Sequence, residues 1–458
     1  MSVVELPVSA ERRASRIAFD LRDRIIQREA TIGIVGMGYV GQPLAIAIQA
    51  QDFDVIGFDV DRVRVNRLNS SRTALRTIGD DKILRMRQSG KFRASSNFAE
   101  LEIPDVIVIC VPTPLNKFRE PDLSYVRKTA EDISATLRPG QLVCLESTSY
   151  PGTTADILRP LMESTGYKVG RDVFLAFSPE REDPGNEEYG TADIPKVVGA
   201  DDEASRDLAE AFYGSFAKRV VRVSSTATAE AVKLTENIFR CVNIALVNEL
   251  KHVYGHMGID LWEVIEAAST KPFGFMPFYP GPGVGGHCIP VDPFYLSWKA
   301  RENESPARFI ELAGEINSAE PLHVVSAVSR ALSMHLQKSM NGARVLLLGL
   351  SYKKNVDDIR ESPALVIMRN LEAQGCSVRY FDPWIPVIPT TREYAEFVGR
   401  RSIEWNPKTF RETFDAAIIV TDHDSVDYQV LVESMNLVVD TRNATRDVQQ
   451  HRDRIVMA

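Results

Sequence analysis

The chain has 458 residues, of which 44% are hydrophobic and 25% are charged. This composition is that of an ordinary globular protein, and a chain of this length is expected to divide into two or three domains. The formal net charge of −8 at pH 7 gives no general attraction to nucleic acid or to anionic membranes, so neither is expected as a partner.

No targeting segment or metal site is predicted. No apolar run approaches the roughly 20 residues that span a bilayer, and the N-terminal stretch has no uninterrupted apolar core of the signal-peptide kind, so we expect a cytoplasmic protein. The five cysteines form no CxxC pair, which argues for reduced thiols. His252 and His256 are four residues apart, but the sequence between them lacks the glutamate of the HExxH zinc motif.

The first 30 residues are expected to form a helical extension, because ERRASRIAFDLRDRIIQ has an amphipathic pattern. The pattern does not distinguish packing on the same subunit from packing on another. A strand pattern, TIGIV, follows at residues 31–35, and then a glycine turn, GMGYVG, and an apolar helix pattern. Strand, glycine turn and helix in this order are typical of dinucleotide binding.

Each glycine of this turn has an expected task. Gly36 makes the tight turn, Gly38 lets a pyrophosphate approach the backbone, and Gly41 allows the helix to pack closely on the strand. The next apolar run ends at Asp59, 23 residues after Gly36, where a carboxylate can hydrogen-bond the ribose of NAD and repel the 2′-phosphate of NADP. Arg64 weakens this preference slightly, unless it is a solvated helix charge. The predicted cofactor-binding residues are Gly36, Gly38, Tyr39, Val40, Gly41, Asp59, Arg64, Thr113 and Thr148.

Further strand patterns alternate with helical stretches and predict a mostly parallel sheet. They lie at residues 105–111, 141–147, 173–178, 196–200 and 219–223. Ligands of such sheets bind beyond the carboxyl ends of the strands, where this sequence places VPTP (111–114), EST (146–148) and SPERE (178–182). Each of these segments taken alone is also an ordinary turn.

The stretch from Thr226 to Tyr254 contains neither proline nor glycine and has helical periodicity, so it predicts one long helix that links two domains. Lys233 and Asn237 are neighbours on one face of it, with Arg240 and Asn243 near the same line. Such residues usually face solvent, but the nearby apolar stripe and the position between two sheets favour a functional face.

A run of glycines surrounds Cys288 in GPGVGGHCIP (281–290). Glycine serves where the backbone takes a positive φ or comes very close to another group, so this setting suggests an approach path for a ligand to the thiol. The alternative is a surface turn with an incidental cysteine. Cys110 and Cys144 lie in apolar strand patterns and are expected to pack in the core. Asp292, four residues after Cys288, is placed to activate or order water.

Residues 343–382 repeat the order of strand, turn and helix without the glycine triplet. This second unit therefore lacks the dinucleotide pattern, although its helix N-termini and the basic turn with Lys353, Lys354 and Arg360 can hold another phosphate-bearing ligand. The expected fold class is α/β, with two Rossmann-like doubly wound parallel-sheet domains joined by a long central helix. The expected domains are residues 1–30 (helical extension), 31–225 (NAD-binding), 226–335 (central, with the cysteine loop) and 336–458 (substrate nucleotide).

With NAD predicted as the cofactor, the thiol of Cys288 can be assigned a chemical role. Removal of hydride from an alcohol gives an aldehyde, which a thiolate can trap as a thiohemiacetal; a second hydride transfer gives a thioester, and water releases an acid. Lys233 and Asn237 are placed to stabilise the oxyanion or assist proton removal.

Six motifs resemble, in order, those of the UDP-sugar 6-dehydrogenases, which include UDP-glucose dehydrogenase: GMGYVG, VPTP, SPERE, AEAVKLTENIFR, GPGVGGHCIPVDP and SYKKNVDDIRES. The resemblance implies a homo-oligomer formed through the central helix and a UDP-sugar substrate in the last domain. It implies that Cys288 is the nucleophile, with catalytic assistance from Lys233, Asn237, Asp292, Glu180 as acid/base and Thr113, which orders water. The implied substrate-binding residues are Glu180, Arg181, Lys233, Asn237, Arg240, Gly285, Tyr352 and Lys353.

The sequence differs from part of this family next to Cys288 and Asp292, and this difference limits the choice of sugar substrate. Enzymes for UDP-glucose and GDP-mannose usually carry lysine before the catalytic aspartate, whereas this chain has Val291 there and His287 before Cys288. This pattern resembles the branch that oxidises UDP-N-acetylglucosamine to its uronic acid, and we favour it over the UDP-N-acetylmannosamine branch, which shares part of the pattern. Arg240 and Asn243 either reach the acetamido group or are interface or packing positions on a buried helix.

Other functions stay open at this point. UDP-glucose is an alternative substrate, and a non-catalytic nucleotide-sugar sensor or a single-step dehydrogenase are alternatives to the four-electron enzyme. They differ in the NADH formed per sugar: none for the sensor, one for the single step and two for the four-electron reaction. The sequence does not choose between capsule, lipopolysaccharide and another polysaccharide as the destination of the product.

Overall fold

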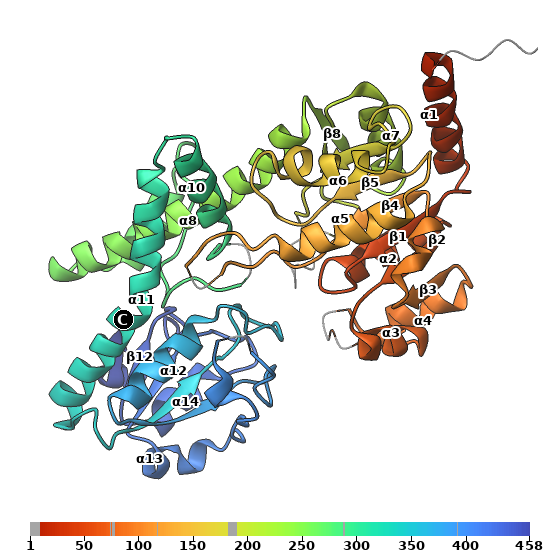
Figure 1. The fold of residues 1–458 in the computed structure, drawn as a ribbon. Coiled ribbons are helices and arrows are strands. Elements are labelled where there is room, and N and C mark those ends of the chain that lie inside the picture. The colour runs from red at the N-terminus through yellow and green to blue at the C-terminus, as the bar shows by residue number, and fades with distance from the viewer. Residues whose placement is uncertain are drawn as a thin grey trace, which may run out of the picture. The chain divides into compact units, whose positions relative to one another are not determined.

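The structure is a computed structural model that describes residues 10–73, 75, 78–116, 118–181, 190–286, 289–391 and 393–458. The chain forms two compact units, Met1–Glu236 with Trp298–Glu304, and Asn237–Ser297 with Ser305–Ala458. Each unit contains its own sheet with helices on both faces (Figure 1), which confirms the predicted α/β fold class. Across the described ranges, no helix combines the length and the apolar character needed to cross a membrane.

The first unit has an eight-stranded sheet in the order β3-β2-β1-β4-β5-β6-β7-β8. Its first six strands follow the Rossmann order, and every pair is parallel except β6 with β7. The strands are β1 (Thr31–Val35), β2 (Asp54–Phe58), β3 (Phe92–Ser95), β4 (Val106–Ile109), β5 (Leu142–Leu145), β6 (Phe174–Phe177), β7 (Lys196–Gly199) and β8 (Val220–Val223).

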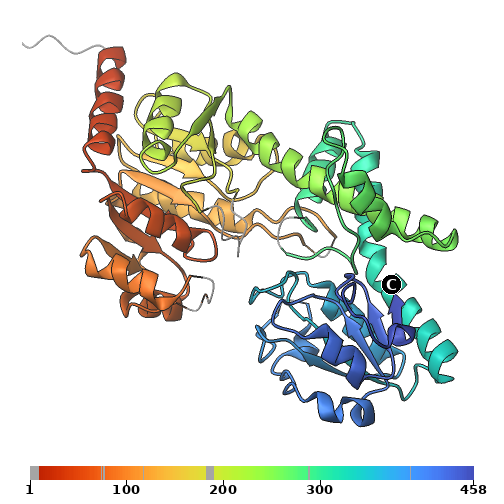
Figure 2. The ribbon, with the colours of Figure 1, turned by 180° about the vertical axis from the view of Figure 1, so that it is seen from behind.

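Helices cover both faces of this sheet, as Figure 2 shows from behind, so its strands are apolar on both sides. One face carries α2 (Gly41–Gln49), α3 (Arg62–Asn69), α4 (Asp80–Gln88) and α7 (Glu203–Tyr213). The other face carries η1 (Phe98–Glu102), α5 (Ser124–Thr136), η2 (Thr154–Leu158) and α6 (Arg159–Glu163). Cys144 lies in the core between the sheet and the face that carries α2 and α7, and Cys110 packs against this core, as predicted.

The N-terminal helix α1 (Ala10–Ile26) packs on its own subunit. Leu21 and Ile25 are buried in the core that α7 also lines. Both nitrogens of the Arg24 guanidinium fork donate to the Asp105 carboxylate, at 2.5 and 2.6 Å. The apolar side of α1 therefore contributes to the core of the first unit.

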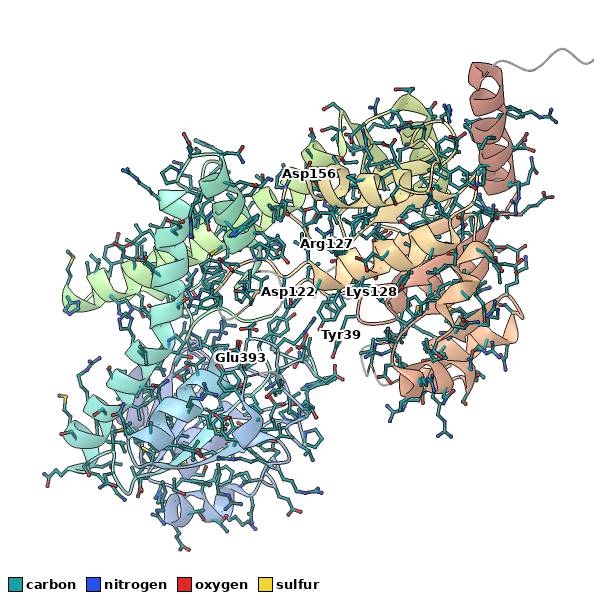
Figure 3. All side chains as sticks on the ribbon, viewed as in Figure 1. Tyr39, Asp122, Arg127, Lys128, Asp156 and Glu393 are labelled. Carbon is teal, nitrogen blue, oxygen red and sulfur yellow. The ribbon has the colours of Figure 1, made fainter. Side chains whose placement is uncertain are left out.

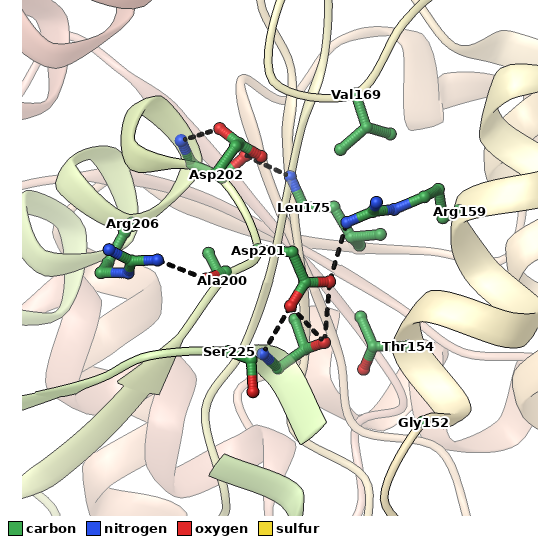
Figure 4. Close-up of polar contacts among 12 residues, drawn as sticks. Gly152, Thr154, Arg159, Val169, Leu175, Ala200, Asp201, Asp202, Arg206 and Ser225 are labelled. Carbon is green, nitrogen blue, oxygen red and sulfur yellow. Dashed lines mark hydrogen bonds and ion pairs between the residues drawn. The ribbon is translucent and has the colours of Figure 1, made fainter. Parts of the chain in front are cut away.

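The predicted long helix is α8 (Thr226–His256), which extends two residues beyond the expected end. At its start, the carboxylate of Asp201, after β7, accepts hydrogen bonds from the Thr226 backbone N–H at 3.1 Å and from the Thr226 hydroxyl. Arg159 pairs with the same carboxylate at 2.7 Å (Figure 4). An acidic cap at this end also favours the helix electrostatically. Three helices follow, α9 (Leu261–Ser269), α10 (Asp292–Glu302) and α11 (Arg308–Leu336).

The second unit contains a five-stranded parallel sheet in the order β10-β9-β11-β12-β13, which is the flavodoxin-like order. Its strands are β9 (Arg344–Leu348), β10 (Ser377–Phe381), β11 (Ala416–Ile419), β12 (Val438–Asp440) and β13 (Ile455–Met457). One core lies against α11 and α12 (Pro363–Ala373), and the other against α13 (Phe410–Thr413) and α14 (Tyr428–Ser434). Short 3₁₀ turns complete it: η3 (Ala395–Phe397), η4 (Pro407–Thr409) and η5 (Arg452–Arg454).

Candidate active site

The glycine turn after β1 has the geometry expected of a dinucleotide site. Gly36 has φ +97°, and a Cβ there would lie 2.5 Å from the Cys110 carbonyl oxygen. A Cβ on Gly41 would lie 1.9 Å from the Gly36 carbonyl oxygen, so only glycine lets α2 start this close to the turn. Apart from its two chain neighbours, no heavy atom of the described residues lies within 4 Å of the Cβ position of Gly38, which leaves space for a pyrophosphate beside the backbone.

Asp59, which follows β2, is held in place by a hydrogen bond from the glycine turn. Asp59 is buried and accepts hydrogen bonds from the backbone N–H groups of Met37 and Asp61, both at 2.9 Å. The Arg64 guanidinium pairs with it at 2.7 Å. Tyr39, labelled in Figure 3, projects from the same turn. This arrangement fits the ribose end of NAD, and Asp59 and Arg64 stay the proposed contacts there.

Two more strand exits lie at the same edge of the sheet. The Ser147 hydroxyl donates to the Val111 carbonyl oxygen at 2.7 Å and thereby joins the ends of β4 and β5. Thr113 is buried after β4, and Thr148 is half-buried after β5. Because β1, β4 and β5 are consecutive in the sheet, these threonines line the edge that also carries the glycine turn.

The SPER segment after β6 docks on α8 through two consecutive residues. The Lys233 ammonium donates to the Glu180 backbone carbonyl and lies 3.5 Å from the Glu180 carboxylate. Arg181 pairs with Glu236 at 2.6 Å. Lys233 is only 5% exposed, so its helix face is covered, as the functional interpretation required. The structure thus brings together two predicted catalytic residues, a cation and a carboxylate, in the first unit.

One buried carboxylate near this pair escaped prediction. Glu230, on α8, accepts hydrogen bonds from the backbone N–H groups of Gly152 (2.6 Å) and Thr154 (2.9 Å) and from the Ser149 and Thr154 hydroxyls. Burial raises the pKa of its carboxyl to about 7, although these donors favour the charged form. Through these hydrogen bonds, Glu230 connects the segment after Thr148 to α8. It was not predicted, because a glutamate within a helical pattern is usually a solvent-exposed charge.

In the second unit, Asn237 and Asp292 are both fully buried and in contact. The Asn237 amide nitrogen donates to an Asp292 carboxylate oxygen, and Arg240 donates to the Asn237 amide oxygen. Asp292 stands at the start of α10. The predicted assisting amide and carboxylate therefore form one pair, and the Asn237 side chain is oriented from both ends.

The glycines before the cysteine pack against the chain itself. A Cβ on Gly285 would lie 2.7 Å from the Tyr352 Cβ and 3.0 Å from the Glu361 carbonyl oxygen. Gly286, with φ +82°, donates its N–H to the Arg360 carbonyl oxygen at 2.9 Å. The close approach that these two glycines permit is made here by the segment after β9, and the approach path for a ligand to the thiol stays a prediction. Cys288 and His287 lie outside the described residues.

Two buried asparagines hold the start of this loop. The Asn248 amide oxygen, on α8, accepts the Gly281 N–H at 3.0 Å. Its amide nitrogen donates to Asn317 of α11 at 3.0 Å, and Asn317 donates to the Cys241 carbonyl oxygen at 3.0 Å. Sequence reasoning missed both residues, because nothing in the pattern distinguishes a buried asparagine from an exposed one.

Replacing Asn248 with alanine should leave the Gly281 N–H and the Asn317 amide without their partners. We expect stability to fall by about 1–3 kcal/mol, and kcat to fall at least about tenfold because the loop loses its anchor. The affinity for NAD should not change, since the glycine turn is in the other unit. Thermal unfolding, turnover and NAD titration measure these effects. Asn303→Ala, which removes an exposed amide bonded to its own helix, should change none of them.

The basic turn after β9 is largely neutralised by its surroundings. Lys354 pairs with Asp424 at 3.0 Å, and Arg360 pairs with Asp358 at 2.7 Å. Lys353 directly precedes Lys354 in sequence, and its carbonyl oxygen accepts a hydrogen bond from the Ser351 hydroxyl at 2.9 Å. Lys354 and Arg360, both predicted to hold a phosphate, are therefore engaged in ion pairs. Tyr352 and Lys353 remain the proposed substrate contacts of this turn.

The chain has a sheet of the dinucleotide-binding type, followed by a second sheet of a nucleotide-binding type. Buried Lys233, Asn237 and Asp292 lie on the helices of these two units. Together these features define the class of two-domain, nicotinamide-dependent dehydrogenases. Residues 30–217 match the NAD binding domain of the UDP-glucose/GDP-mannose dehydrogenase family, residues 227–319 its central domain and residues 346–447 its UDP binding domain. The chain belongs to this family, and it is an NAD-dependent UDP-sugar dehydrogenase, as predicted from the motifs.

Individual relatives differ in substrate. The chain is 35% identical over 369 residues to a UDP-N-acetyl-D-glucosamine 6-dehydrogenase of Pseudomonas aeruginosa, covering 80% of this chain and 86% of that protein. It is 33% identical over 422 residues to a UDP-N-acetyl-D-mannosamine dehydrogenase of Pyrococcus horikoshii, covering 91% and 96%. The solved structure of a UDP-D-ManNAc dehydrogenase from Pyrococcus horikoshii superposes with a TM-score of 0.83 at 32% identity, covering 93% of this chain and 98% of that one.

Proposed function

We propose that the chain oxidises the 6-hydroxymethyl group of UDP-N-acetylglucosamine to the carboxylate in two steps, through a covalent intermediate on Cys288. The observation that carries this proposal is the anchoring of Gly285 and Gly286 on Tyr352, Arg360 and Glu361. The two residues before His287 and Cys288 are fixed to the region that matches the UDP binding domain, so a sugar attached to bound UDP can be presented to the thiol.

The proposed reaction balances as two oxidations and one hydrolysis. NAD, when bound, accepts one hydride in each oxidation, so two molecules are reduced per sugar. The Cys288 sulfur adds to the aldehyde carbon, and the thiohemiacetal that results loses a second hydride to become a thioester. Water then breaks the carbon–sulfur bond, which releases the acid and returns the thiol.

The neighbouring residues have proposed roles that follow from their burial and charge. Lys233 and Asn237 donate hydrogen bonds to the oxygen that becomes negative when sulfur adds. Asp292, buried beside Asn237, and Glu180, beside Lys233, are the bases that take a proton from water or the sugar hydroxyl. Thr113, at the end of β4, orders the water.

The choice of N-acetylglucosamine rests on Val291, His287 and the likeness to the Pseudomonas aeruginosa enzyme. The main alternative is UDP-N-acetylmannosamine, which the likeness to the Pyrococcus horikoshii protein favours. Arg240 is the proposed contact to the acetamido group, because its guanidinium already donates a hydrogen bond to Asn237. Gly285 is proposed to contact the sugar, and Lys353 is proposed to contact the diphosphate.

A panel of UDP-sugars tests the proposal. We expect two NADH per UDP-N-acetylglucosamine and at least about tenfold lower kcat/KM with UDP-N-acetylmannosamine and UDP-glucose. One NADH per sugar would indicate a single oxidation, and none would indicate a sensor. Equal kcat/KM values for the three sugars with two NADH each would reject the substrate assignment and keep the four-electron reaction.

The proposed assembly is a homodimer or larger homo-oligomer. Three exposed apolar residues on α8 support it: Phe239, Leu246 and Val253, spaced seven residues apart and between 41% and 52% exposed. This spacing places them in one stripe along the helix, which a second copy can cover. Light scattering should give at least about twice the 51.1 kDa chain mass, and a monomer at micromolar concentration would contradict it.

A further inference from the structure

The second unit contains a cluster of metal-ligating side chains outside the site described above. Glu320 of α11 is fully buried, and one of its carboxylate oxygens faces two histidines. His252 Nε2, from α8, lies 2.7 Å from Glu320 Oε1, and His323 Nδ1 lies 3.2 Å from the same oxygen. The two imidazole rings are edge to face, with centroids 4.3 Å apart.

We propose that His252, Glu320 and His323 form a binding site for a divalent transition-metal ion of the zinc type. The three ligand atoms lie within 4.8 Å of one another. Two atoms bound to one tetrahedral zinc ion lie about 3.3 Å apart, so small side-chain rotations suffice to place an ion among them. Glu320 and His323 have the Glu-x-x-His spacing that metal sites in helical bundles use on one helix.

The donor set selects the class of metal. Two imidazole nitrogens and one carboxylate oxygen suit zinc and its neighbours better than magnesium or calcium, which prefer oxygen ligands. Each neutral histidine gives up the N–H that it donates to Glu320 by moving that proton to its other ring nitrogen. Because the His323 side chain is half exposed, the fourth position of the ion is open to solvent.

Lys251 sets the expected strength of binding. Its ammonium pairs with the other Glu320 oxygen, Oε2, at 2.9 Å, and so leaves Oε1 for the metal. This contact orients the carboxylate, as partners of metal ligands commonly do. The positive charge also repels a cation, so the site should bind more weakly than one without the lysine. Bound metal would join α8 to α11 and raise the melting temperature.

Cobalt(II) titration of an untagged chain tests the site, because cobalt with nitrogen and oxygen ligands absorbs visible light and zinc displaces it. The titration is done in a Cys288→Ala background, so that the thiol does not compete. We expect one cobalt per chain and a higher melting temperature with zinc. His323→Ala should weaken binding at least about tenfold, and Lys251→Met should strengthen it.

The matched control is His256→Ala. His256 is on the same helix, but its Nδ1 bonds to the His252 carbonyl oxygen instead of facing the cluster, so its loss should leave cobalt affinity unchanged. The proposal is overturned if His323→Ala binds cobalt as the parent does, or if His256→Ala weakens binding as much. His323→Gln replaces His323→Ala if the latter does not fold, with the same expected loss. None of these measurements depends on dehydrogenase activity.

Discussion

Replacing Cys288 with alanine should lower the rate of carboxylate formation at least about 10³-fold. Without the sulfur, the aldehyde has no covalent attachment while the second hydride leaves, and it exchanges with solution instead. The measurement is NADH and acid released per UDP-sugar, followed until the substrate is consumed. Acid formation at more than about a tenth of the parent rate would show that water, and not the thiol, adds to the aldehyde.

Two further variants sharpen this result. Cys376→Ala is the matched thiol control, because Cys376 is buried in the second unit, where burial raises the pKa of its thiol and its S–H donates to the Met340 carbonyl oxygen. Its activity should stay within about twofold of the parent. Asp292→Asn should slow the release of the acid, and intact-protein mass spectrometry should then detect the acyl group on Cys288.

Gly38→Ala should weaken NAD binding at least about tenfold while stability stays within about 0.5 kcal/mol of the parent. Gly38 has no positive φ, and within the described part of the chain only its sequence neighbours lie near the position of the added methyl group, so we expect the folded chain to tolerate it. That same space is where the pyrophosphate is expected. Calorimetric titration with NAD and thermal unfolding measure the two effects separately.

Gly41→Ala gives the opposite pattern and serves as the comparison. The new methyl carbon would lie 1.9 Å from the Gly36 carbonyl oxygen, so the helix must move away from the turn. We expect a loss of about 2 kcal/mol or more in the free energy of unfolding, measured without cofactor. If Gly38→Ala instead bound NAD as the parent does, the pyrophosphate would not pass over this part of the turn.

Much of the fold could be predicted because its signals are local. Fully buried parallel strands give continuous apolar runs, and the glycine turn and the long helix each have their own pattern. β3 was missed, because FRAS is short and carries a charge, and so was β13, whose three residues give too little pattern. Both are edge strands, so fewer neighbours constrain their sequences.

The site could be predicted only as far as its motifs reach. Four residues were predicted to be catalytic, Lys233, Glu180, Asn237 and Asp292. The structure brings Lys233 into contact with Glu180, and Asn237 into contact with Asp292. Asn248, which holds the loop, could not be found, because its partner is a backbone group 33 residues away in sequence. Long-range hydrogen bonds to the main chain leave no periodic trace in the sequence.

The packing of Gly285 and Gly286 on Tyr352 and Glu361 has a consequence for protein engineering. A chimaera could take the segment after β9 from a relative in order to change which sugar is accepted. It would then also change the residues against which Gly285 and Gly286 pack. Retargeting this enzyme therefore calls for exchanging both segments together, because a swap of one alone would misplace the sulfur even where the new sugar binds well.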